Sequence, residues 1–131
     1  MDAIRVENLH RAFGVVQALD GLNLRVAKSS VFGFLGPNGA GKTTTIRILT
    51  GLLRPDSGRV WISGLALAEH RRAIARRIGY LPEAPAFYSW QTPREFLDYV
   101  GAVFALPAAE RSARTQFLLD LVDLADVAGR R

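Results

Sequence analysis

The residues whose types and spacing suggest chemistry form one glycine-rich run that fits the pattern G-x-x-x-x-G-K-[ST]. The run is Gly36, Pro37, Asn38, Gly39, Ala40, Gly41, Lys42 and Thr43, and Thr44 follows it. Glycines let consecutive backbone N–H groups point at a phosphate without an intervening Cβ. A lysine at this position reaches the β- and γ-phosphates of a nucleotide, and the threonine hydroxyl is a ligand for Mg²⁺. The pattern therefore predicts a phosphate-binding loop with Lys42 as the cation and Thr43 as the metal ligand.

Such a loop needs a buried strand before it and a helix after it. Residues 31–35 are apolar throughout, which is typical of a strand buried on both faces of a mostly parallel sheet. Residues 42–53 carry apolar side chains at helical spacing, so we expect a helix whose positive N-terminal end faces the phosphates. The alternative is a glycine-rich turn that contains a lysine by chance, and the flanking elements argue against it.

The remaining sequence predicts further strands and helices. Residues 4–7 and 22–26 alternate apolar and polar side chains, which is typical of antiparallel strands with one wet face. Short strands are expected at residues 60–62 and 78–81, and a basic helix at residues 69–77. The order of these elements predicts an α/β fold.

The last third of the chain is predicted to be helical. Thr92 and Glu95 have the spacing of a capping box, with Pro93 at the first helical position. Leu106 and Pro107 break this helix, and a second helix is expected after them.

Composition limits the other function classes. The chain has 131 residues and no cysteine, which excludes disulfides, thiolate catalysis and cysteine-bound metal centres. No apolar run approaches the roughly 18 residues that span a bilayer, and the N-terminus does not look like a signal peptide, so we expect a cytoplasmic location.

The net charge of +5 suits an anionic partner. We expect a solvated helix face, and no nucleic-acid partner, for the cluster Arg71, Arg72, Arg76 and Arg77, because no aromatic side chains are interleaved with it.

The loop and its flanks resemble the ATP-binding cassette (ABC) ATPases. Residues 36–44 look like the phosphate loop of that family, and residues 49–58 resemble the stretch that follows it. Residues 9–14 resemble the segment whose aromatic residue stacks on adenine, which would be Phe13. Residues 78–83 resemble the strand that leads into the family's Q-loop. The resemblance implies that ATP and Mg²⁺ are the cofactors.

Glu83 is a candidate for catalysis and for binding Mg²⁺. It follows Pro82 at the end of a predicted strand, and ligands of open α/β sheets bind at the carboxyl ends of strands. A carboxylate there could ligate Mg²⁺ or hold the attacking water. The alternative is a solvated loop residue. The family usually has glutamine at this position, although its exporter-type members often have glutamate.

The resemblance covers nearly the whole chain, which we interpret as a single, incomplete nucleotide-binding domain over residues 1–131. Residues 1–83 would form the antiparallel β portion and the phosphate-loop core, and residues 84–131 the Q-loop and the start of a helical subdomain. The sequence lacks the family's signature loop, its strand ending in Asp-Glu and its switch histidine. We therefore expect these 131 residues alone to bind ATP without hydrolysing it at a useful rate, because the glutamate that activates water in the family, at the end of the Asp-Glu strand, is absent.

The resemblance implies an ATP-binding subunit that powers transport across a membrane, with an exporter-type system favoured. Its partners would be a transmembrane permease subunit and a second nucleotide-binding domain, and it would lie at the inner face of the cell membrane. Two alternatives remain open. The first is a non-catalytic nucleotide-binding or interaction fragment, and the second is a different phosphate-loop enzyme such as a small kinase or a GTPase.

Overall fold

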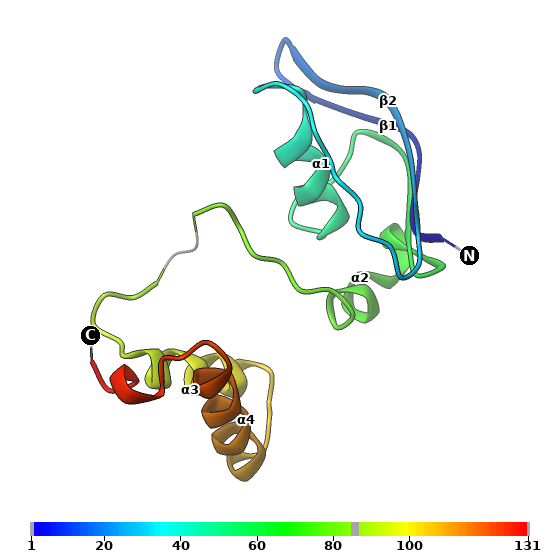
Figure 1. Ribbon diagram of the computed structural model, residues 1–131. Helices are drawn as coiled ribbons and strands as arrows, with labels where there is room; N and C mark the ends of the chain where they lie inside the picture. Colours follow the sequence, from blue (N-terminus) through cyan, green and yellow to red (C-terminus); the bar gives the residue numbers. More distant parts are fainter. Residues whose placement is uncertain (1, 85–86, 131) are drawn as a thin grey trace. The chain divides into compact units, whose positions relative to one another are not determined.

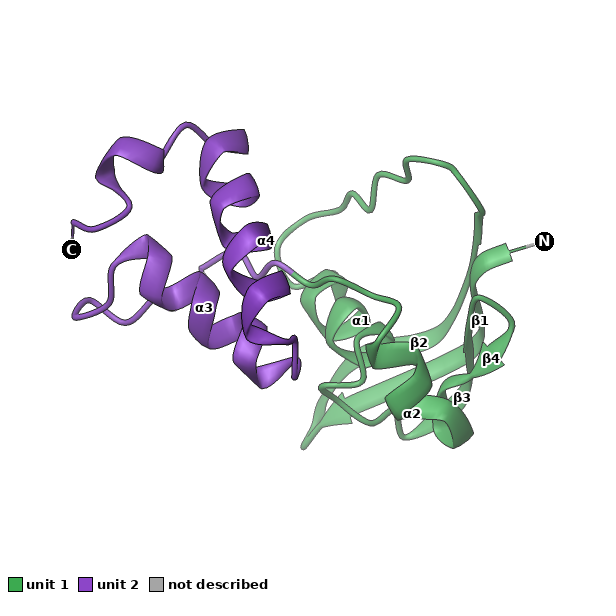
Figure 2. Ribbon diagram, turned by 90° about the horizontal axis from the view of Figure 1, so that it is seen from below, with its two compact units in different colours: residues 1–80 green, residues 81–131 purple. Residues whose placement is uncertain are grey.

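The computed structural model describes residues 2–84 and 87–130 and divides the chain into two compact units. Figure 2 colours them separately, with residues 1–80 in the first unit and residues 81–131 in the second. Within the described residues, no helix combines the length and the apolar character that crossing a membrane requires.

An antiparallel sheet organises the first unit. Its strands are β1 (Asp2–Phe13), β2 (Val16–Ala27), β3 (Ser57–Ile62) and β4 (Leu65–Ala66), in the order β2-β1-β3-β4. Every strand pairing among the described residues is antiparallel. The long hairpin of β1 and β2 closes at the pair Phe13 and Val16, where Gly14 has a φ of +58°. The predicted antiparallel strands at residues 4–7 and 22–26 are thereby confirmed.

Two helices, α1 (Lys42–Leu49) and α2 (Leu67–Ala75), pack on the sheet and close the core of this unit (Figure 1). Ile48 of α1 and Ile74 of α2 are almost fully buried against sheet residues such as Val6. The contact between β1 and β3 depends on Gly58, since a Cβ there would lie 2.4 Å from the carbonyl oxygen of Asn8. A side chain at this position would force the two strands apart.

Helix α1 ends earlier than residue 53, the end that the apolar spacing predicts. Gly51 has a φ of +76° and donates its N–H to Ile48 O, while the N–H of Leu52 bonds to Arg47 O. These two bonds form a Schellman motif, which satisfies the last helical carbonyls and turns the chain out of the helix. After the helix, Leu53 packs beside the core, whereas Leu52 is exposed.

The strands predicted at residues 31–35 and 78–81 are not formed, and this part of the prediction is wrong. Both segments lack regular secondary structure, and the side chains of Val31, Leu35 and Leu81 are largely exposed. A strand needs a neighbouring strand that accepts its backbone hydrogen bonds. No strand among the described residues pairs with either segment, so their apolar composition alone does not produce a sheet.

The second unit contains α3 (Pro93–Val103), α4 (Ala108–Leu121) and a short 3₁₀ turn, η1 (Ala125–Val127). The predicted capping box is confirmed, because Glu95 N donates to Thr92 Oγ1 at 3.2 Å and Thr92 N donates to Glu95 Oε2 at 2.8 Å. Helices α3 and α4 meet where Arg111 crosses Gly101 and pairs with Asp98 at 2.6 Å.

Candidate nucleotide-binding site

The glycine-rich loop of the first unit leads directly into α1. Gly39 and Gly41 have φ values of +82° and +80°, in the left-handed region that glycine adopts without strain. A Cβ on Gly41 would lie 2.5 Å from Ala18 O and 2.6 Å from Leu19 Cδ2, both on β2. The end of the loop therefore rests against the β1–β2 hairpin, and only glycine fits at this contact.

Lys42 folds back over the loop. Its Nζ donates to Gly36 O at 2.5 Å and to Pro37 O at 2.7 Å, and the turn beneath it is closed by Ala40 N donating to Pro37 O at 3.2 Å. An ammonium group has three donors. Among the described residues these bonds use two of them, so the ammonium is held over the loop with a donor left for an anion.

The N-terminus of α1 is suited to a polyanion. No side chain caps it, and its first turn contains no acidic residue. The first N–H groups of a helix have no acceptor within the helix, and the helix dipole adds positive potential there. Thr45 is buried and donates its hydroxyl to Gly41 O at 2.9 Å, which engages that hydroxyl within the helix. Thr43 is exposed and Thr44 is half-buried, so both remain accessible to a ligand.

The residues present fit Mg²⁺ bound together with phosphate. The described residues contain no group of three or more His, Asp or Glu side chains that could hold a metal ion by themselves. A cation at this site would therefore draw its ligands from phosphate oxygens and from the exposed Thr43 hydroxyl.

Phe13 lies at the end of β1, next to the hairpin turn. The residue is 48% exposed, and the guanidinium carbon of Arg11 lies 4.8 Å from the ring centroid. Its strand partner Val16 is two residues from Ala18, against which Gly41 packs. The hairpin thus brings the predicted aromatic residue and the phosphate loop to the same end of the first unit.

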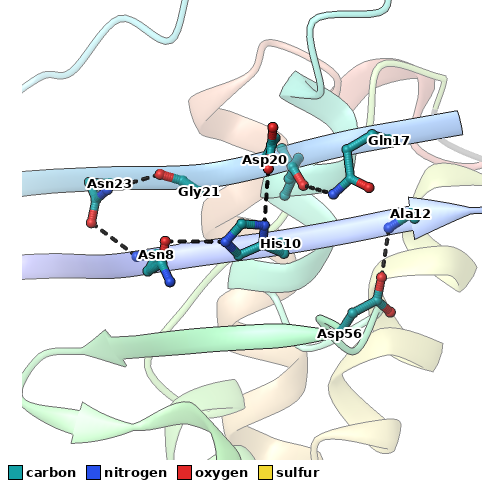
Figure 3. Close-up of polar contacts among 9 residues, drawn as sticks. Asn8, His10, Ala12, Gln17, Asp20, Gly21, Asn23 and Asp56 are labelled. Carbon is teal, nitrogen blue, oxygen red and sulfur yellow. Dashed lines mark hydrogen bonds and ion pairs between the residues drawn. The ribbon is translucent and has the colours of Figure 1, made fainter.

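Two residues at this end were not among the sequence-predicted site residues. Asp56 accepts a hydrogen bond from Ala12 N at 2.7 Å, shown in Figure 3, and another from Arg11 Nη1 at 2.6 Å. The bond from Ala12 and the nearby Arg11 cation hold the pKa of Asp56 below its ordinary value of 3.8, although desolvation of the carboxylate opposes them. From the sequence, Asp56 is predicted only as a turn residue. No sequence pattern indicates that it contacts Arg11, which lies 45 positions away.

Glu83 is exposed and belongs to the second unit, whereas the phosphate loop belongs to the first. The strand expected before it is not formed. Its contact with Mg²⁺ or with the attacking water stays a prediction.

An antiparallel hairpin, a glycine-rich loop and an uncapped helix that starts at a lysine are typical of phosphate-loop nucleotide-binding proteins, but the buried strand expected before the loop is not formed. The chain matches the ABC transporter family over residues 19–131, and it therefore belongs to that family. The chain is 44% identical to the daunorubicin resistance ATP-binding protein DrrA3 of Streptomyces coeruleorubidus, over 98% of this chain and 40% of that protein. It is 45% identical to the bacitracin transport ATP-binding protein BcrA of Bacillus licheniformis, over 72% of this chain and 31% of that protein.

The fold of this chain is also similar to that of solved ABC transporter structures. A solved structure described as the ATP-binding subunit of an ABC transporter superimposes with a TM-score of 0.80 at 29% identity. The match covers 97% of this chain and 53% of the other. The predicted α/β class with an N-terminal antiparallel portion is confirmed, and the chain spans less than half the length of the curated relatives named above.

Proposed function

We propose that this chain binds Mg-ATP through residues 36–44 and belongs to a subunit in which ATP hydrolysis powers transport across a membrane. The observation that carries the proposal is the uncapped start of α1, over which Lys42 is held by two loop carbonyls. Relatives named for daunorubicin resistance and for bacitracin transport support a role in moving compounds across a membrane. The permease subunit, the second nucleotide-binding domain and the place at the inner membrane face are parts of the same proposal.

Each residue of the site has a distinct role in this proposal. The loop N–H groups and Lys42 neutralise and orient the phosphates. Thr43 contributes a hydroxyl ligand to Mg²⁺, and the ion offsets charge on the phosphate oxygens. Phe13 offers a flat apolar surface on which adenine stacks. Glu83 would act on Mg²⁺ or on water in the whole protein.

We expect binding without useful hydrolysis from the 131 residues alone. Hydrolysis needs a carboxylate that positions and activates water beside the γ-phosphate. The loop and α1 carry no acidic side chain that could do this, since the first turn of α1 has none.

The test is a calorimetric titration of the chain with Mg-ATP, beside Lys42→Ala, with circular dichroism to show that both are folded. We expect saturable binding that Lys42→Ala weakens by about tenfold or more, equivalent to roughly 1.4 kcal/mol. A folded chain that binds no Mg-ATP, or that binds equally well without the lysine, would refute the proposal. A strong preference for Mg-GTP over Mg-ATP would show that the proposed nucleotide is wrong.

A further inference from the structure

The end of β1 that carries Phe13 extends beyond its neighbour on one side. The pairing of β1 with β3 stops at His10 and Ser57, whereas its pairing with β2 continues to Phe13. The register with β2 is irregular around Arg11. A two-stranded ribbon without a third strand is only marginally stable, so this end needs another anchor.

Asp56 supplies that anchor. It stands immediately before β3, and its own N–H donates to His10 O at 3.0 Å. One oxygen of its carboxylate accepts a hydrogen bond from Ala12 N, and the other accepts one from Arg11 Nη1. The turn before β3 thereby holds the backbone of β1 and the Arg11 side chain together.

Arg11 in turn lies over the Phe13 ring. Its Nε is buried and has no hydrogen-bond partner among the described residues. The guanidinium is therefore located by Asp56 on one side and by the ring on the other, with its carbon 4.8 Å from the ring centroid. One face of Phe13 is covered by the cation, and the half-exposed ring can receive a base only on its other face.

We propose that Arg11, held by Asp56, is a positioning residue that fixes Phe13 so that its uncovered face receives the nucleobase. This inference rests on the proposed binding of ATP and adds a determinant of base recognition to it. In this proposal Arg11 acts on the base through Phe13, because its guanidinium is engaged by Asp56 and by the Phe13 ring. A fixed ring stacks better than a mobile one, since less side-chain freedom is lost on binding.

The experiment compares two ligands that share the phosphate chemistry, Mg-ATP and Mg-tripolyphosphate, by calorimetry on the 131-residue chain. The variants are Arg11→Ala, Asp56→Ala and Phe13→Ala, together with the double variant of Arg11 and Phe13. Asp98→Ala is the matched control, because it removes another 2.6 Å arginine–aspartate pair, one in the second unit whose side chains have similar exposure. Circular dichroism confirms that each variant is folded.

We expect Arg11→Ala and Asp56→Ala to weaken Mg-ATP binding by about three- to tenfold, as part of the stacking contribution of the ring. Binding of Mg-tripolyphosphate and both affinities of Asp98→Ala should remain within twofold of the wild type. In the Phe13→Ala background, Arg11→Ala should have no further effect, because residues that act through one another are not additive.

Three results would overturn the inference alone, with the binding function intact. They are equal weakening of both ligands by Arg11→Ala, an undiminished effect of Arg11→Ala without Phe13, or unchanged Mg-ATP affinity in both single variants. The proposed function fails in a different way. In that case the wild-type chain binds neither Mg-ATP nor Mg-tripolyphosphate, or Lys42→Ala leaves both affinities unchanged, and the inference is overturned with it.

Discussion

Replacing Gly41 with alanine tests whether the phosphate loop is held against the β1–β2 hairpin by a contact that excludes every side chain. Two costs follow from the structure. The residue has a φ of +80°, and the left-handed region costs an L-residue about 1–2 kcal/mol. The new Cβ would also lie 2.5 Å from Ala18 O, a backbone atom that cannot rotate away, and overpacking costs about 1–3 kcal/mol. Together they predict a loss of about 2–5 kcal/mol, a large part of the roughly 5–15 kcal/mol that stabilises a typical domain.

Gly39 provides the matched control for this substitution. Its φ is +82°, but a Cβ there would meet nothing within 4 Å. Gly39→Ala should therefore show only the conformational cost of about 1–2 kcal/mol. Urea unfolding followed by circular dichroism gives the free energy of unfolding for the wild type and both variants. If Gly41→Ala is no more destabilising than Gly39→Ala, the reasoning from the contact with Ala18 is wrong.

Three further predictions concern the capping box, the anchor of β1 and the Q-loop position. Thr92→Ala removes the hydroxyl that accepts the N–H of Glu95, so thermal unfolding should show a loss of about 1 kcal/mol, whereas an unchanged midpoint would mean that the cap does not stabilise α3. Because the pKa of Asp56 is lowered in the folded chain, its stabilising contribution is complete above pH 3.8 and is lost as the pH falls through the lower, folded value. The urea midpoints of wild type and Asp56→Ala should therefore differ at neutral pH and converge in acid, and a constant difference would contradict this. Glu83→Gln removes a negative charge from the proposed site and should make ATP binding less dependent on Mg²⁺ in titrations with and without the ion, and identical Mg²⁺ dependence would place Glu83 outside the site.

Patterns of neighbouring residues were sufficient to predict several secondary-structure elements of this protein. The loop motif, the two alternating strands and the capping box at Thr92 and Glu95 each depend on residues close together in the sequence. Dihedral preferences and short-range hydrogen bonds act over the same distance. The antiparallel strands and the cap therefore form as predicted, and the helix that follows the loop starts as predicted but ends at Leu49.

The apolar run at residues 31–35 shows where local patterns fail. Its composition is typical of a central strand, but its backbone has no strand partner among the described residues. A β-strand forms only beside another strand, because its backbone hydrogen bonds are made to that neighbour. Composition can say that a segment would be stable inside a sheet, but it cannot supply the neighbouring strand.

The sequence by itself determined the family to which the chain belongs and predicted the phosphate loop with its lysine and threonine, because both depend on consecutive residues. Only the tertiary structure decided that Gly41 rests on Ala18 and that Asp56 joins Arg11 at the end of β1. Such contacts depend on strand register and on how far each strand extends beyond its neighbour. Register and overlap are set by packing across the whole sheet, since shifting a strand by one residue reverses which face each of its side chains occupies.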